Sequence, residues 1–193
     1  MPANSEFTTP LPSPSRQAAQ RDQADLQDYK ADWVQHFEEA KARLQTLLGP
    51  RATTLQHVGS TAVPTMVAKP TIDILLITPD LRTLDDCATE MAGIGYKAHG
   101  EYGITGRRYF TMANSHSHSL GTSVNLYAFE PGHRHALNLL LLRDYLRSNA
   151  DARHRYSSIK RALAKEHPAN PGAYQAGKQP IFEWLLAKAT GRR

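Results

Sequence analysis

The feature that most constrains this chain is one stretch, which runs from His57 to Ile77. It passes through the turn Gly59-Ser60-Thr61 and two prolines, then ends in an apolar, β-branched run. That run is too short for a helix and is typical of a buried strand. It contains one carboxylate, Asp73. A buried carboxylate is costly unless a cation, a metal ion or several hydrogen-bond donors compensate its charge.

The residues around Asp73 favour a binding site. The Gly-Ser-Thr turn brings hydroxyl donors and close backbone approach, the usual setting for an anionic group, and Lys69 lies four residues before Asp73. The alternative is structural: Asp73 caps a neighbouring loop, and residue chemistry alone leaves the two interpretations equally open. His57 could carry a proton, although a histidine at a strand end is more often a structural hydrogen-bonding group.

Length and composition indicate an ordinary globular protein. At 193 residues, one domain with a proper core is expected at 21–193, after a proline-rich, disordered tail at 1–20. The single cysteine, Cys87, cannot form an internal disulfide, which favours a reducing compartment. No segment approaches the ~20 apolar residues that span a bilayer, and the N-terminus lacks the apolar core of a signal peptide. We therefore expect a cytoplasmic protein without membrane contact.

Charge is distributed unevenly along the chain. From Arg134 onward there are twelve Lys and Arg residues against four Asp and Glu, whereas the preceding part carries a net charge of −3. A basic C-terminal third, on a chain of net charge +5, favours a polyanionic partner such as a nucleic acid or a nucleotide. The alternative is a set of well-solvated helix faces.

Hydrophobic periodicity predicts the order of the elements. We expect a helix from about Asp22 to Gly49-Pro50 and another from Pro79 to Gly93. A core helix should follow at 135–146, then a helix capped by Asp151 and a last one opened by Asn170. The expected strands are 53–58, 72–77, 107–112 and 121–129, the last two forming a hairpin, with a short strand or loop at 94–99.

Several polar residues within these elements are candidates for a site. Asn125, Tyr127 and Phe129 alternate onto one face of their strand. Two pairs with helical i, i+4 spacing, Tyr156/Lys160 and Tyr174/Lys178, could line one wall of an anion site, unless they are ordinary surface lysines. His116 and His118 could chelate a metal, but no third ligand is evident and a solvated turn is favoured.

These motifs together resemble the GrpB family, which is also found fused behind some dephospho-coenzyme A kinases. The resemblance runs from about Tyr29 to Ala189 and rests mainly on the long first stretch. It implies an α+β, nucleotidyltransferase-like fold: a mixed sheet flanked by helices, with a C-terminal helical part. The supporting matches are Asn125 to Gly132, Leu142 to Arg147, Tyr156 to Lys160 and Tyr174 to Lys178.

The resemblance also exposes a difference from active nucleotidyltransferases. Those enzymes hold two Mg²⁺ ions with two carboxylates placed two residues apart on this strand. Here the position after Asp73 on the same face is Leu75, which cannot bind a metal. Thr65 replaces the usual glycine, and Tyr127 replaces a family histidine. Two-metal transfer is therefore disfavoured, and we predict neither a metal nor another cofactor.

One branch that resembles this family makes arginine-containing cyclodipeptides from aminoacyl-tRNAs, a reaction without a metal pair. The resemblance then implies that Asp73 or Glu130 binds a guanidinium and that Tyr127 or His57 relays protons. Ser60, Thr61 and Asn125 would donate to an oxyanion. The substrate would be arginyl-tRNA, bound through basic helices that contribute Arg143, Lys160 and Lys178.

The alternative function is binding of a nucleotide or small phosphorylated ligand. Its candidate residues are those of the glycine turn and the helical Tyr/Lys pairs: Gly59, Ser60, Thr61, Lys69, Tyr156, Lys160, Tyr174 and Lys178. The partner is thus tRNA or a nucleotide-linked small molecule, and the oligomeric state stays open.

Overall fold

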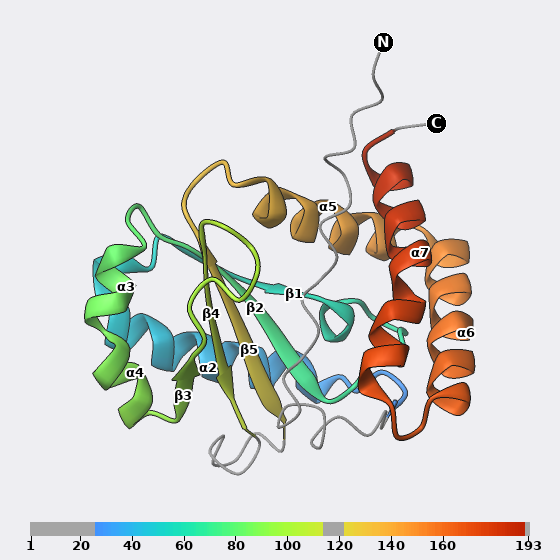
Figure 1. Ribbon diagram of the computed structural model, residues 1–193, viewed down its shortest axis with the longest axis horizontal. Helices are drawn as coiled ribbons and strands as arrows, with labels where there is room; N and C mark the ends of the chain where they lie inside the picture. The colour runs from blue at the N-terminus through green and yellow to red at the C-terminus, as the bar shows by residue number, and fades with distance from the viewer. Residues whose placement is uncertain (1–25, 114–121, 192–193) are drawn as a thin grey trace.

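The architecture is that of a computed structural model, which describes residues 26–113 and 122–191 (Figure 1). The expected tail at 1–20 and the pair His116 and His118 lie outside the described residues. The elements in chain order are α2 (Asp32–Leu48), η1 (Gly49–Arg51), β1 (Thr54–Val58), η2 (Ser60–Ala62), β2 (Thr71–Ile77), α3 (Arg82–Asp86), α4 (Ala88–Gly93), β3 (Tyr96–Ala98), β4 (Arg107–Met112), β5 (Ser123–Phe129), α5 (Arg134–Ser148), α6 (Ala150–Glu166) and α7 (Pro171–Ala189).

The strands form one mixed sheet in the order β1-β2-β5-β4-β3. β2 and β5 run parallel, whereas the other neighbouring pairs are antiparallel. The expected hairpin is confirmed, because β4 pairs with β5 in antiparallel register from Arg107 opposite Phe129. The apolar run with Asp73 is β2, which lies between two partners as its composition predicts. The α+β class with a mixed sheet and C-terminal helices is therefore confirmed.

The two faces of the sheet meet different partners. In Figure 1, α2 crosses behind the sheet, where Trp33, Phe37 and Leu44 join Ile72 and Ile74 in the largest core cluster. α5 lies along one end of the opposite face, and α6 and α7 stand beside it. A separate apolar cluster joins these C-terminal helices to the segment after η2, through Val63 and Met66. This opposite face, only partly covered by helices, is where polar side chains can gather.

Within the described residues, the helix expected from about Asp22 begins only at Asp32. The backbone N–H and C=O of Gln27 bond to Ala68 at 2.9 and 3.0 Å, in an isolated antiparallel bridge. This pairing holds residues 26–31 outside the helix, although Leu26 and Tyr29 continue the helical stripe. Long-range pairing therefore overrides the local pattern here.

Three other helical predictions need correction. The helix expected at 79–93 is interrupted at Cys87, giving the short helices α3 and α4. Asn149, not Asp151, caps α6, because its side-chain oxygen accepts a hydrogen bond from the Ala152 N–H at 2.8 Å. α5 is only partly a core helix, since Leu137 and Leu141 are 50% and 42% exposed. Among the described residues, no helix is both long and apolar enough to cross a membrane.

His57 occupies the α2 side of the sheet. Its ring stacks on Phe37 with centroids 4.8 Å apart, and its Nε2 lies 3.0 Å from the Thr61 hydroxyl. Burial, and then the charges of Arg147 and Arg143, lower the pKa of His57 to about 4. The neutral imidazole is thus part of the core, which agrees with its structural interpretation.

This histidine makes stability depend on acidity. Between about pH 6.5 and pH 4 the unfolded chain binds a proton at His57 that the folded chain excludes, so stability falls as the pH is lowered. We expect His57 to account for about 2–3 kcal/mol of that loss. Urea unfolding of the wild type and of His57→Gln at pH 7 and pH 4.5 measures it. The exposed His154→Gln serves as the control, and an equal pH dependence in all three proteins would refute the assignment.

Candidate functional site

The site is built around the carboxylate of Asp73, on the sheet face opposite α2. Asp73 pairs in register with Asn125 of β5, and side chains at paired positions share a face. Its Oδ1 accepts hydrogen bonds from Asn125 Nδ2 at 2.9 Å and from the Tyr127 hydroxyl at 3.0 Å. Two donors from the neighbouring strand therefore hold one carboxylate oxygen in place.

Gly59 closes the site on its other side. Its φ of 71° lies in the left-handed region, which disfavours side chains. A Cβ at this position would overlap the Oδ2 atom of Asp73. The turn therefore needs glycine both for its backbone conformation and for its close approach to the carboxylate.

Tyr109 of β4 extends the hydrogen-bond network and was not predicted as a site residue. Its hydroxyl donates to Asn125 Oδ1 at 3.0 Å, so the Asn125 amide accepts from Tyr109 while it donates to Asp73. The rings of Tyr109 and Tyr127 stack with centroids 5.3 Å apart. The sequence held a signal for this residue, because a β4–β5 hairpin in the observed register places Tyr109 directly beside Tyr127.

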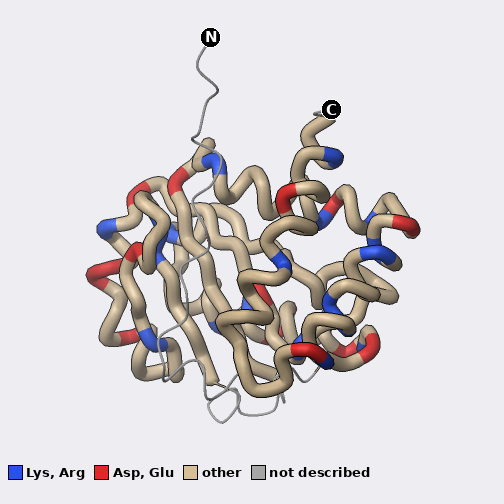
Figure 2. Tube along the Cα trace, turned by 45° about the vertical axis from the view of Figure 1, so that its right-hand side comes forward, with Lys and Arg blue, Asp and Glu red and all other residues tan. Residues whose placement is uncertain are grey.

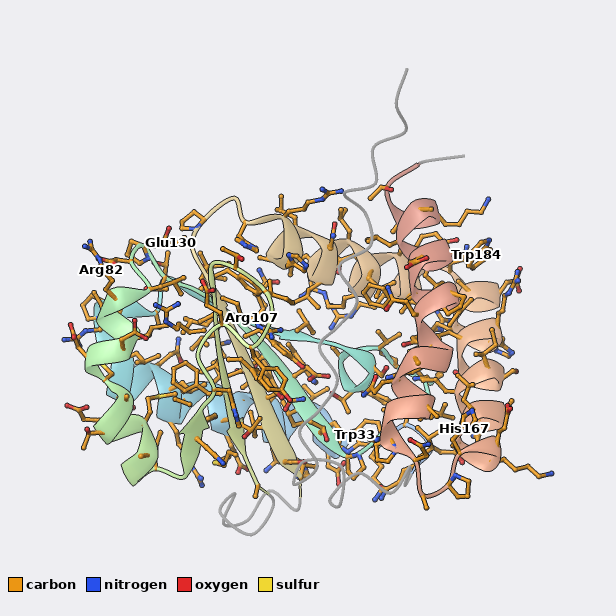
Figure 3. The ribbon with its side chains drawn as sticks, viewed as in Figure 1. Trp33, Arg82, Arg107, Glu130, His167 and Trp184 are labelled. Carbon is orange, nitrogen blue, oxygen red and sulfur yellow. The ribbon has the colours of Figure 1, made fainter. Side chains whose placement is uncertain are left out.

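Arg107 places a positive charge beneath these rings. Only 4% exposed, its guanidinium lies 5.1 Å from the centroid of Tyr109 and 5.9 Å from that of Tyr127. It donates to the carbonyl oxygens of Glu101 and Tyr102 at 3.1 and 2.6 Å. Burial lowers its pKa. Figure 3 shows Arg107 in front of the sheet.

The C-terminal helices bring lysines to the site. Lys160 of α6, 3% exposed, donates to the Val67 carbonyl and lies 3.0 Å from the Ser60 hydroxyl. Burial, then the charges of Lys178 and Arg161, lower the pKa of Lys160 to about 7. The Nζ of Lys178, from α7, lies 4.8 Å from the ring of Tyr174, and Lys69 Nζ lies 5.0 Å from the same ring.

The acid and the phenol at the centre of the site both resist ionisation. Burial raises the pKa of Asp73, and the hydrogen bonds from Asn125 and Tyr127 and the charge of Lys178 offset only part of this effect. The pKa of Tyr127 is raised well above its usual value by burial and by the charge of Asp73. A cationic group of a ligand in contact with Asp73 would therefore stabilise the ionised form of its carboxylate.

Most of the predicted site residues are brought together. Asp73 acts electrostatically on Tyr156, whose pKa is raised by burial and then by Tyr174 and Asp73. The charge of Lys178 acts on both Asp73 and Lys160. The assembled group comprises Gly59, Ser60, Lys69, Asp73, Asn125, Tyr127, Tyr156, Lys160, Tyr174 and Lys178.

Four predicted residues lie elsewhere or are already engaged. His57 faces α2, as described above. Glu130 lies five residues beyond Asn125, roughly 16 Å along the strand, and accepts from the Leu81 N–H at 3.4 Å (Figure 3). Thr61 donates to the Thr71 carbonyl and is 1% exposed. Arg143 donates to Gln56 at 2.8 Å and to the His57 carbonyl at 3.1 Å. The geometry supports none of them as a direct partner of Asp73.

The site does not offer a cluster of metal ligands. Leu75, which follows Asp73 on the same face, is fully buried. Within residues 26–113 and 122–191, no three His, Cys, Asp or Glu side chains are arranged to hold an ion. A surface cavity of about 300 Å³ lies beside the turn, not at Asp73, and is lined by Tyr29, Val34, Ala62, Pro64, Thr65, Arg147 and Arg153.

Comparisons with known proteins agree on one family. The family model described as GrpB protein matches residues 23–188. UPF0157 protein YqkA of Bacillus subtilis is 35% identical over 158 residues, which cover 81% of this chain and 43% of that protein. The dephospho-CoA kinase of Mycolicibacterium paratuberculosis is 27% identical over 83% of this chain and 46% of that protein. The chain thus spans less than half the length of these two relatives.

One solved structure has a closely similar fold. The crystal structure of conserved protein GrpB from Enterococcus faecalis matches with a TM-score of 0.79 and 29% identity, over 86% of this chain and 97% of that chain. A fainter similarity, with a TM-score of 0.48 and 17% identity, covers 77% of this chain and 46% of Cid1 in complex with its short product ApU.

Gly59 provides a direct test of the close approach. We expect Gly59→Ala to destabilise the protein by about 3 kcal/mol or more, because a left-handed alanine costs about 1–2 kcal/mol and the overlap with Asp73 adds to it. Gly132→Ala is the matched control, since its φ is also positive, at 81°, but nothing lies within 4 Å of the new Cβ. Thermal and urea unfolding compare the two variants. Equal losses would show that Gly59 is needed only for its backbone.

The ionised carboxylate of Asp73 should lower the free energy of unfolding of the ligand-free protein. Since burial raises its pKa, the ligand-free folded protein is destabilised at every pH above the ordinary value of 3.8. We expect Asp73→Asn to raise the free energy of unfolding at pH 7, because its amide oxygen can still accept from Asn125 and Tyr127. The gain should fade as the pH falls toward 4. Asp86→Asn, on the exposed end of α3, is the control, and a destabilised Asp73→Asn would contradict the prediction.

Proposed function

This chain belongs to the GrpB family, and from that premise we propose that it is an aminoacyl-tRNA-dependent cyclodipeptide synthase that uses arginyl-tRNA. The observation that carries the proposal is the isolated carboxylate of Asp73. It lies among hydroxyl groups and lysines, and the next position on its face is an apolar leucine. Such a site is suited to a cationic organic substrate more than to a pair of magnesium ions.

Asp73 supports recognition of a guanidinium or an α-ammonium group. Asn125 and Tyr127 both bind Oδ1, and within the described residues Oδ2 has no hydrogen-bond donor. A cation contacting Oδ2 would lower the raised pKa of Asp73 and form a charge-assisted hydrogen bond. Tyr109 and Arg107 hold this arrangement in place through Asn125 and the stacked rings.

The reaction that suits these groups is attack of an amine on an aminoacyl ester. The new C–N bond forms as the C–O bond to the ribose breaks, and the amine proton passes to the leaving ribose oxygen. A second attack of the same kind closes the ring. Lys160, whose pKa is about 7, can exchange protons near neutral pH, and the charge of Lys178 can stabilise a developing oxyanion.

The positive charge of the C-terminal helices favours binding of a polyanionic partner. Figure 2 shows the basic residues of this region, and Arg155, Arg161 and Lys165 are exposed along α6. Contacts of this kind with phosphates are independent of sequence and weaken as salt rises. A tRNA acceptor stem is a polyanion of suitable type.

A second candidate function is binding of a nucleotide or small phosphorylated ligand. The observation that favours it is the group of lysines, Lys69, Lys160 and Lys178, on the side of Ser60 and Tyr174. Lysine ammonium groups beside a glycine turn are common phosphate partners.

Expression in a bacterial host tests the first proposal. Mass spectrometry of the medium should detect cyclodipeptides that contain arginine. Asp73→Ala should lower their yield by about 10- to 100-fold, the equivalent of one charge-assisted interaction of 1.5–3 kcal/mol.

Asp86→Ala is the matched control, since it removes one exposed carboxylate and should leave the yield unchanged. The purified protein with arginyl-tRNA should form the same products. If neither assay yields a diketopiperazine, while a phosphorylated ligand binds and Lys178→Met weakens that binding, the second function holds instead.

A further inference from the structure

We propose that Ser60 is a catalytic nucleophile that carries the aminoacyl group as an ester, with Lys160 as its general base. This inference deepens the proposed function and rests on it for the identity of the acyl group. It assigns Ser60 a covalent role, in place of hydrogen-bond donation to a substrate.

The two side chains come from distant parts of the chain. Ser60 opens η2 directly after Gly59, and α6 brings Lys160 to it across 100 residues of sequence, with 3.0 Å between Oγ and Nζ. Lys160 also donates to the Val67 carbonyl, and its Nζ lies 4.6 Å from the centroid of the Tyr156 ring. The amine is therefore held on three sides, in the geometry that defines a nucleophile and its base.

The environment of Lys160 suits a base. It is almost fully buried, it forms no ion pair with a carboxylate within the described residues, and Lys178 and Arg161 add positive charge around it. A neutral amine still has hydrogens to donate to Val67, and its lone pair can accept the Ser60 proton. Ser60 itself is only partly buried, so a substrate can reach the hydroxyl while the base stays away from water.

Neighbouring hydroxyl groups lack the contact with a lysine amine that Ser60 has. Thr61 donates to the Thr71 carbonyl and contacts His57, and it is 1% exposed. Ser123 is paired with the Thr71 hydroxyl at 3.1 Å. Of these three hydroxyls, only that of Ser60 is hydrogen-bonded to an amine.

The chemical step is balanced by the groups present. Ser60 Oγ attacks the ester carbonyl of the aminoacyl-tRNA while its proton passes to Lys160 Nζ. A C–O bond to Ser60 forms, the C–O bond to the ribose breaks, and Lys160 returns the proton to the ribose oxygen. The first tRNA then leaves. The α-amine of a second aminoacyl-tRNA attacks the seryl ester: a C–N bond forms, the C–O bond to Ser60 breaks, and the amine proton passes through Lys160 to Ser60 Oγ. The free α-amine of the resulting dipeptidyl-tRNA attacks its own ester, which closes the ring as the ribose oxygen leaves with the amine proton. One basic surface can therefore serve two tRNA molecules in turn.

A serine-directed fluorophosphonate probe tests the pair without assuming any substrate. We expect the purified protein to be labelled at Ser60, as located by tandem mass spectrometry, with a rate that rises as the pH passes through about 7. Lys160→Met and Lys160→Arg should each slow labelling by about 100-fold or more, because neither can accept the proton. The arginine variant keeps a positive donor, which separates base catalysis from positioning.

Ser60→Ala should abolish labelling, whereas Ser158→Ala, an exposed serine of α6, should be labelled at the wild-type rate. Thermal unfolding first establishes that each variant folds. With arginyl-tRNA carrying radiolabelled arginine, the wild type should retain acid-stable label on Ser60 and Ser60→Ala should not.

The two proposals fail in different ways. Cyclodipeptide formation that persists in Ser60→Ala would overturn the nucleophile and leave the proposed function intact. Labelling of Ser60 that depends on Lys160, without any diketopiperazine product, would support the pair and overturn the proposed acyl donor. A folded wild type that the probe does not label, or a Lys160→Arg variant labelled at the wild-type rate, would overturn the pair outright.

Discussion

The contact between Asp73 and its donors is the constraint on which the rest of the site depends. A carboxylate within a sheet is costly, and two hydrogen bonds to Oδ1 offset only part of that cost, because the pKa of Asp73 stays raised. Gly59 presses against the other oxygen, so the backbone of the turn and the carboxylate position each other. The same turn places Ser60 within hydrogen-bonding distance of Lys160. One glycine therefore contacts Asp73 and directly precedes Ser60 in the backbone.

Two sources of positive charge surround this acid. Arg107 lies beneath the stacked tyrosines of β4 and β5, whereas Lys160 and Lys178 arrive from α6 and α7. The arginine is bound by backbone carbonyls and rings, so it supports the architecture. The lysines lie beside the turn and Asp73, where a substrate would bind. This division explains how one small face can hold several cations, one of them, Lys160, with a pKa near neutrality.

The comparisons establish the family and agree with the observed fold, whereas the proposed chemistry combines a resemblance to one branch of that family with the geometry of the site. Active two-metal transfer depends on paired carboxylates. In this chain the partner position is Leu75, part of an apolar cluster with Val58 and Phe129. The same face that would carry a second metal ligand instead carries core packing. A reaction based on one acid, one amine and one hydroxyl is consistent with that substitution.

Much of the fold and the central acid could be predicted from the sequence, because β-branched runs, turn residues and i, i+4 pairs act locally. β2, the hairpin and the Tyr/Lys pairs of the last two helices were predicted in this way. What lies beside Asp73 depended on strand register and helix packing. Register put His57 on the α2 side, although it is separated from Asp73 by one position in the β1–β2 pairing. It also placed Tyr109 at the site, and only the approach of α6 joined Lys160 to Ser60. The contact between Lys160 and Ser60 spans 100 residues, so no local pattern encodes it.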